Sequence, residues 1–293
     1  MKRNIFRITT AVILSGILAG IASDSLNAMS WPSDDSVLVS NFGANSSGKP
    51  VLGMIFEGGT NVFAAESGEV IFSRNRNDTA SRLPSPLGAW TAIDHADGLI
   101  SIYSRYDESE PAQLTYVERN QTIASCGTSG WSDTAGFYFM LFDRRERRWI
   151  NPAMIITPVL ETRPPVIISV SLLNSQGQAA QSNNLNQGRY TVVVNAAAGI
   201  PVSGPSGQYA PHRILCSING AEVGSLNFES VSARDGIQVV SRNGLIPAKQ
   251  VYANYQSYEA AEVFLTRGQV TLEVIVQDIS GNSRSTVSRL TVN

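Results

Sequence analysis

The chain has 293 residues, of which 43% are hydrophobic and 16% are charged, and its formal net charge is −2. This length is enough for one or two domains with a buried core, and the composition is that of a globular protein. The near-neutral charge excludes a general electrostatic attraction to nucleic acid, so we expect no nucleic-acid partner.

The first 28 residues have the features of a secretory signal peptide. A cationic start, MKRNIFR, precedes the apolar run ITTAVILSGILAGIA, and small residues follow from Ser25 to Ala28. The run is shorter than the roughly 20 residues that a membrane span needs. We therefore expect residues 1–28 to be removed and the protein to be exported to the periplasm or cell envelope. An uncleaved membrane anchor is the alternative.

Residues 29–160 are expected to form a first domain built from short strands. Its polar start, residues 29–50, predicts an arm or an initial strand and turn. Stretches such as AWTAIDHADGLISIYS and AGFYFMLF are strand-like and bounded by turn residues, and no segment has a convincing helical period. The stretch DRRERR (143–148) predicts a solvated hairpin turn, with a basic surface for anionic glycans or lipids as the alternative.

A second domain is expected over residues 163–293. The stretch ETRPPVI (161–167) predicts a short semi-rigid linker, because paired prolines keep the chain extended. Beyond it, alternating apolar residues and Gly/Asn/Ser turns predict an immunoglobulin-like β-sandwich. The tyrosine-rich stretch VYANYQSYEAAEVFL could form a strand, or a loop with one helical turn. Cys126 and Cys216 could bond to each other or be separate buried residues.

Four stretches of the first domain follow the motifs of a known family in order. They are GMIFEGGTNVFAAESGEVIFS, WTAIDHADGLISIYSRY, VERNQTIASCGTSGWSDTAG and WINPAMII. On these motifs the domain resembles the LytM/lysostaphin-type zinc endopeptidases, which cleave peptide cross-links in bacterial cell walls. The predicted fold is therefore all-β, with a LytM-like sheet domain (duplicated hybrid motif) followed by the immunoglobulin-like sandwich.

The resemblance also says where the zinc ligands would stand. The family holds zinc with the His and Asp of an H-x-x-x-D motif and the second His of an H-x-H motif, which leaves an open position for the attacking water. The first motif falls on Val51 and Ile55, and the second falls on Phe137 and Phe139. None of these residues is a usual zinc ligand.

A shift of one residue would move the H-x-H positions to Gly136 and Tyr138, which are not usual ligands either. The family's catalytic histidine of a Y-x-H stretch falls on Arg105. We expect Arg105 to pair with a nearby acid such as Asp107 or Asp94. Alternatively, it could contact a carboxylate of a ligand, because the planar guanidinium suits one.

The histidine count supports a lost metal site. The whole chain has two histidines, His95 and His212, fewer than the family site uses. A zinc site needs three or four converging ligands, so we expect no metal, no other cofactor and no enzymatic activity. Apolar side chains at the ligand positions would form ordinary core or the floor of an apolar groove.

Several further residues could line such a groove and stack on sugars or peptides, although aromatic residues in strands are more often core. The candidate groove residues are Arg105, Tyr103, Tyr138, Trp90 and Trp131.

The leading hypothesis is a non-catalytic cell-envelope protein that binds peptidoglycan or regulates a separate cell-wall hydrolase, an option that the resemblance implies. One alternative is an active metalloendopeptidase with a rebuilt site. Another is a structural or adhesive surface protein that makes its contacts through the second domain.

Overall fold

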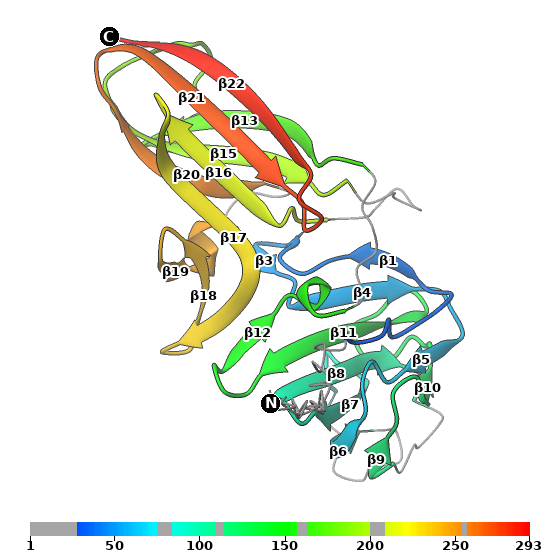
Figure 1. The fold of residues 1–293 in the computed structure, drawn as a ribbon. Helices are drawn as coiled ribbons and strands as arrows, with labels where there is room; N and C mark the ends of the chain where they lie inside the picture. The colour runs from blue at the N-terminus through cyan, green and yellow to red at the C-terminus, as the bar shows by residue number, and fades with distance from the viewer. Residues whose placement is uncertain (1–27, 75–83, 109–113, 157–162, 200–208, 253–256) are drawn as a thin grey trace, which may run out of the picture.

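The computed structural model describes residues 28–74, 84–108, 114–156, 163–199, 209–252 and 257–293. The predicted signal peptide and most of the polar loop at residues 74–88 lie outside these ranges, as does part of the predicted linker. The described chain is built almost entirely of strands arranged in two lobes (Figure 1). No helix within these ranges is long and apolar enough to cross a bilayer.

The first lobe, residues 28–156, is organised around one antiparallel sheet. Its backbone is the order β12-β11-β8-β7-β6-β9, with β4 alongside β11 and β1 alongside β4. The strands of this lobe are β1 (Val37–Ser40), β2 (Asn45–Ser46), β3 (Lys49–Pro50), β4 (Gly53–Glu57), β5 (Asn61–Phe63), β6 (Gly68–Arg74), β7 (Ala89–Asp94), β8 (Leu99–Tyr106), β9 (Tyr116–Val117), β10 (Thr122–Ser125), β11 (Gly136–Asp143) and β12 (Arg148–Ile150), and the 3-10 turn η2 is Pro152–Met154.

Several expectations for this lobe are confirmed. The stretch AGFYFMLF forms β11, and the arginine-rich stretch forms the turn between β11 and β12. Two of its arginines face acids, since Arg144 Nη1 lies 2.6 Å from Asp94 Oδ2 and Arg148 Nε lies 3.9 Å from Asp143 Oδ2. This favours the solvated turn. The polar arm contributes β1 and the small β2–β3 hairpin.

The second lobe has two facing layers of strands. The sheet β13-β15-β20 packs against β22-β21-β16-β17 over a single apolar core (Figure 1). Its elements are β13 (Val166–Asn174), β14 (Asn184–Leu185), β15 (Gly188–Ala197), β16 (Arg213–Ile218), β17 (Ala221–Arg234), β18 (Ile237–Arg242), β19 (Leu245–Pro247), η3 (Ala248–Gln250), β20 (Tyr258–Leu265), β21 (Gly268–Gln277) and β22 (Ser283–Val292). The tyrosine-rich stretch follows η3 and ends in β20. Cys126 and Cys216 are both free.

The two lobes share one continuous sheet, which the sequence did not predict. The 14-residue strand β17 leaves the second lobe and pairs with β12 of the first (Figure 1). Phe42 of the arm is buried in the core of the second lobe, and Asn151 Nδ2 donates to Phe228 O at 2.9 Å. Removing the second lobe would expose Phe42 and one edge of β12, so the first lobe is not separable by simple truncation.

Candidate functional site

Strand β11 divides its side chains between two faces of the central sheet. Phe137, Phe139 and Leu141 belong to the main core of the lobe, whereas Tyr138 and Met140 belong to a separate apolar cluster. Successive side chains of a strand point to opposite faces, and directly paired residues on neighbouring strands share a face. We call the side with Phe137 and Phe139 the core face and the side with Tyr138 and Met140 the site face.

Phe137 and Phe139 are ordinary core residues. The ring of Phe137 stacks on Phe56 with centroids 4.7 Å apart, and Phe139 packs on Tyr103 with centroids 5.1 Å apart. Tyr103 is fully buried, and its hydroxyl accepts a hydrogen bond from Ala65 N at 2.7 Å. Tyr103 therefore has no surface that a ligand could reach, in contrast to its proposed role as a groove residue.

The other two ligand positions lie on the opposite side of the sheet. Ile55 pairs directly with Tyr138, and Val51 packs in the same cluster as Tyr138. Ligands of one metal must converge on one point. The register that uses Phe137 and Phe139 is therefore split across the sheet, and that assignment is corrected. The shifted register is the one that brings Tyr138 to the same face as Val51 and Ile55.

Tyr138 is tied into the lobe by its hydroxyl group, which accepts a hydrogen bond from Leu52 N at 2.8 Å. Burial raises the pKa of Tyr138 to about 12, so the phenol is neutral at pH 7. Gly136, the other position of the shifted register, offers no donor, because a Cβ there would lie 2.0 Å from Phe56 O. This side of the pair cannot hold a side chain without a change of backbone.

Arg105 reaches the site face through a bulge. In the pairing of β7 with β8, Trp90 faces Ser104 and Ala89 faces Tyr106, so Arg105 is the extra residue. Its φ is +66°, in the left-handed region that non-glycine residues rarely adopt. The guanidinium carbon lies 5.0 Å from the centroid of the Tyr138 ring.

The guanidinium of Arg105 has no ion pair with the residues that the structure describes. Arg105 Nε is buried without a hydrogen-bond partner, and burial lowers the pKa of this side chain below its ordinary value. Asp94, one expected partner, is instead bound by Arg144. The expected pairing with Asp94 or Asp107 is thus not what the structure contains.

Both histidines of the chain are engaged elsewhere. His95 is buried, with Nδ1 2.8 Å from Ser67 O and Nε2 2.8 Å from Ser101 Oγ. His212 lies in the second lobe, 3.8 Å from Glu229. Burial lowers the pKa of both.

The residues at the family's metal position do not fit zinc. The shared cluster presents aliphatic side chains, a neutral phenol and one guanidinium, and none of these is a usual zinc donor. Within the described ranges no group of three or more His, Cys, Asp or Glu side chains could hold a metal ion. Sequence reasoning missed two neighbours, Met140 and Leu87. The alternation along β11 already pointed to Met140, but no local signal pointed to Leu87.

The two candidate tryptophans lie in different settings. Trp90 pairs with Ser104, which pairs with Tyr138, so Trp90 is on the site face and half-buried. It stacks on Phe72, with centroids 4.3 Å apart, and Phe72 is 44% exposed. Trp131 is 75% exposed on a loop, where its backbone N–H donates to Pro86 O.

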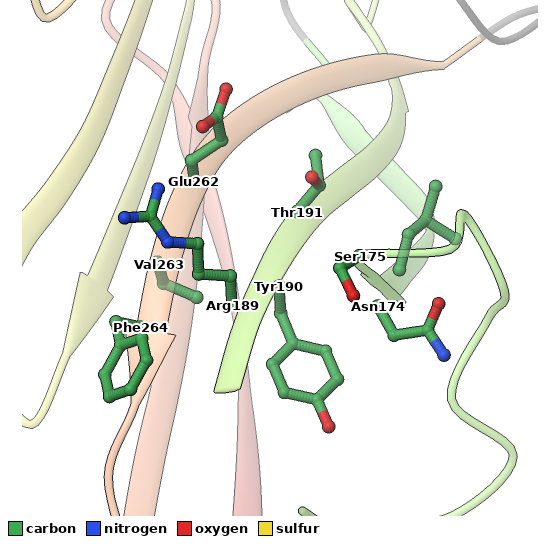
Figure 2. Close-up of a pocket in the computed structure, with 9 residues that line it drawn as sticks. Asn174, Ser175, Arg189, Tyr190, Thr191, Glu262, Val263 and Phe264 are labelled. Atoms are coloured by element: carbon green, nitrogen blue, oxygen red, sulfur yellow. The ribbon is translucent and has the colours of Figure 1, made fainter. Parts of the chain in front are cut away.

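A second concave surface lies on the outer side of β13-β15-β20 in the second lobe (Figure 2). Its volume is about 510 Å³. Glu262 is bound by Arg242 at 2.9 Å, and Phe264 is 58% exposed beside Arg189, its cross-strand partner. The lining residues are Leu173, Asn174, Ser175, Arg189, Tyr190, Thr191, Glu262, Val263 and Phe264.

Comparison with known proteins adds a family to this geometry. Residues 52–152 match the model of peptidase family M23, and residues 164–293 match a second family model that has no description. No curated protein matches the chain.

Similar solved structures include three with different names. The catalytic domain of the prophage-encoded M23 protein EnpA from Enterococcus faecalis is 20% identical, with a TM-score of 0.36, over 42% of this chain and 94% of that one. Lysostaphin from Staphylococcus simulans is 15% identical, with a TM-score of 0.35, over 89% of this chain and 98% of that one. The SpoIIQ–SpoIIIAH pore-forming complex is 22% identical, with a TM-score of 0.37, over 46% of this chain and 95% of that one.

Proposed function

We propose, from the match of residues 52–152 to peptidase family M23, that the protein is a non-catalytic, exported cell-envelope protein whose M23-like domain binds peptidoglycan. The observation that carries this proposal is the filled metal position. Val51, Ile55 and Tyr138 meet on the site face and pack against one another.

The chemistry of these side chains argues against metal-assisted hydrolysis at this position. A hydrolytic zinc needs donors with free lone pairs at one point and an open position for water. The aliphatic side chains of Val51 and Ile55 have no lone pairs, and the phenol oxygen of Tyr138 already accepts the Leu52 N–H. The cation at Arg105 would also repel a divalent ion.

The site face keeps features that suit binding. Phe72 and Trp90 form a stacked, partly exposed aromatic pair, and Ile102 is half-buried in the row between Ala92 and Met140. Aromatic rings with one accessible edge or face are common contact groups for sugars and peptides. Peptidoglycan contains both.

Sedimentation with purified sacculi tests binding. We expect the full-length mature protein to pellet with sacculi and Trp90→Ala to pellet less, with Trp131→Ala, on the exposed loop, as the matched tryptophan control. The same samples, assayed for released muropeptides, should show no hydrolysis. Failure of the wild-type protein to pellet would end the proposal of peptidoglycan binding.

Regulation of a separate hydrolase is the second candidate, and a neutral, filled pocket on an M23-like scaffold is compatible with it. Adding the protein to a wall hydrolase and measuring the change in its rate distinguishes the two. Release of muropeptides by the protein alone would instead favour a rebuilt metalloendopeptidase. Loss of surface adhesion in Phe264→Ala, with sacculus binding intact, would favour an adhesive role of the second lobe.

Export rests on the predicted signal peptide at residues 1–28. Expression of the full chain in a bacterial host, followed by fractionation and N-terminal sequencing, tests it. We expect a mature protein that begins near Met29 in the envelope fraction. A cytoplasmic protein that retains Met1 would contradict export.

A further inference from the structure

We propose that Arg105 is the anchor of a carboxylate-binding site on the site face, and that its ligand is the free C-terminal carboxylate of a short peptide. This inference rests on the proposed binding role of the M23-like domain. It concerns a residue at the family's catalytic-histidine position, but it assigns that residue a different chemistry.

The backbone is shaped to present this side chain. Ser104 faces Tyr138 on the site face, and a regular strand would send the next residue to the core face. The bulge at Arg105 breaks that alternation, so Tyr106 enters the core and Arg105 lies over Tyr138. Bulges of this kind re-aim single side chains, and non-glycine residues in strained conformations cluster at ligand-binding positions.

The charge of Arg105 is uncompensated in the described chain. Its backbone N–H donates to Leu87 O at 2.8 Å, which fixes the backbone, but the side chain has only the ring of Tyr138 beneath it. A guanidinium stacked on an aromatic face keeps its in-plane N–H groups free for an acceptor. Arg105 Nε is buried and unpaired, an arrangement that proteins usually avoid unless another group completes it.

The surroundings favour a carboxylate over a phosphate. A planar carboxylate matches the two parallel N–H groups of the guanidinium. A dianionic phosphate usually requires more positive charge than one arginine, and Glu57 lies on the same face, where it pairs in register with Gly136. The apolar neighbours Leu87 and Ile55 suit the side chains of a peptide rather than a hydrated inorganic anion.

Titration of the full chain with N-acetyl-alanyl-alanine and with its C-terminal amide tests the proposal, by amide chemical shifts or calorimetry. We expect the free acid to bind at least about tenfold more tightly than the amide. Arg105→Gln should lose this preference, and Arg105→Lys should keep only part of it, because lysine retains charge without the fork. Arg189→Gln, which removes an exposed arginine of the second lobe, should behave as wild type.

Arg105→Gly separates ligand binding from structure. Glycine adopts a φ of +66° without strain, so we expect an unchanged or raised Tm, by about 2 °C, together with loss of the acid preference. Equal binding of acid and amide by the wild-type protein, or full acid preference in Arg105→Gln, would overturn the inference.

Sacculus binding reports on the proposed function independently. Wild-type protein that pellets with sacculi but binds acid and amide equally would overturn the carboxylate site and leave the binding function standing. Protein that prefers the acid but does not pellet with sacculi would support the site and end the function.

Discussion

The two faces of strand β11 hold similar residues but have different consequences. On the core face, Phe137 and Phe139 are sealed between aromatic neighbours. On the site face, Tyr138 sits with Ile55 and Val51, under a charged side chain. The comparison teaches that a lost catalytic position cannot be recognised by its apolar character alone. The pairing register decides which apolar residues replaced the ligands and which were always core.

Rebuilding the metal site is expected to give the largest difference between the faces. The triple variant Val51→His/Ile55→Asp/Tyr138→His puts three zinc donors on one face, whereas Val51→His/Ile55→Asp/Phe139→His splits them across the sheet. We expect the first to bind zinc more tightly than the second by on the order of 100-fold, measured by competition with a chelating dye. Circular dichroism of both variants controls for folding. Equal affinities would contradict the assigned register.

Truncating one aromatic residue on each face should separate core from surface. Phe139→Ala removes a fully buried ring and should lower the free energy of unfolding by about 3–5 kcal/mol. Phe72→Ala removes a ring that is 44% exposed and should cost less than about 1.5 kcal/mol. Urea unfolding measures both. A larger loss for Phe72→Ala would reverse the assignment of the faces.

A matched pair of tyrosines sharpens the comparison further. Tyr103→Phe leaves the buried Ala65 N–H without an acceptor and should cost about 1–3 kcal/mol. Tyr138→Phe frees Leu52 N–H, which is only half-buried and can reach water, so about 0.5–1.5 kcal/mol is expected. Thermal unfolding of the two variants under one condition checks the order. The account would be contradicted if Tyr138→Phe were the more damaging change.

The smallest effect concerns pH. Burial lowers the pKa of His95 in the folded protein, whereas in the unfolded chain it titrates near the ordinary value of about 6.5. Below that pH the unfolded chain binds the extra proton, so this contribution to stability is present above about pH 6.5 and is lost as pH falls toward the folded pKa. We expect a decrease of at most about 1.4 kcal/mol per pH unit from this group.

Urea midpoints at pH 7.5 and 5.5 measure this dependence, and His95→Asn should reduce it. His212, whose pKa burial also lowers, should account for part of what remains. A wild-type protein that becomes more stable as the pH falls over this range would contradict the buried, neutral state of both imidazoles.

Much of the fold could be predicted from local patterns, and the site could not. Strand-like stretches such as AGFYFMLF, the arginine-rich turn and the M23-type motifs each carry their own signal within a few residues. The face of Phe137 depends instead on its partner Phe56, some eighty residues away. The bulge at Arg105 and the continuation of the sheet from β12 into β17 are likewise set by tertiary pairing, which has no local signature.

The immunoglobulin-like character of the second lobe and the removal of residues 1–28 remain predictions. The two facing layers around one core agree with a sandwich. The sequence suggested a linker at residues 161–167, but it carried no sign that Phe42 of the arm completes the second core.

The most direct test of the central claim is the zinc content of the full-length mature protein, measured by elemental analysis after purification without chelators and equilibration with excess zinc. With Val51, Ile55, Tyr138 and Arg105 at the family's metal position, we predict far less than one equivalent of zinc per chain. About one tightly held zinc per chain would contradict the account.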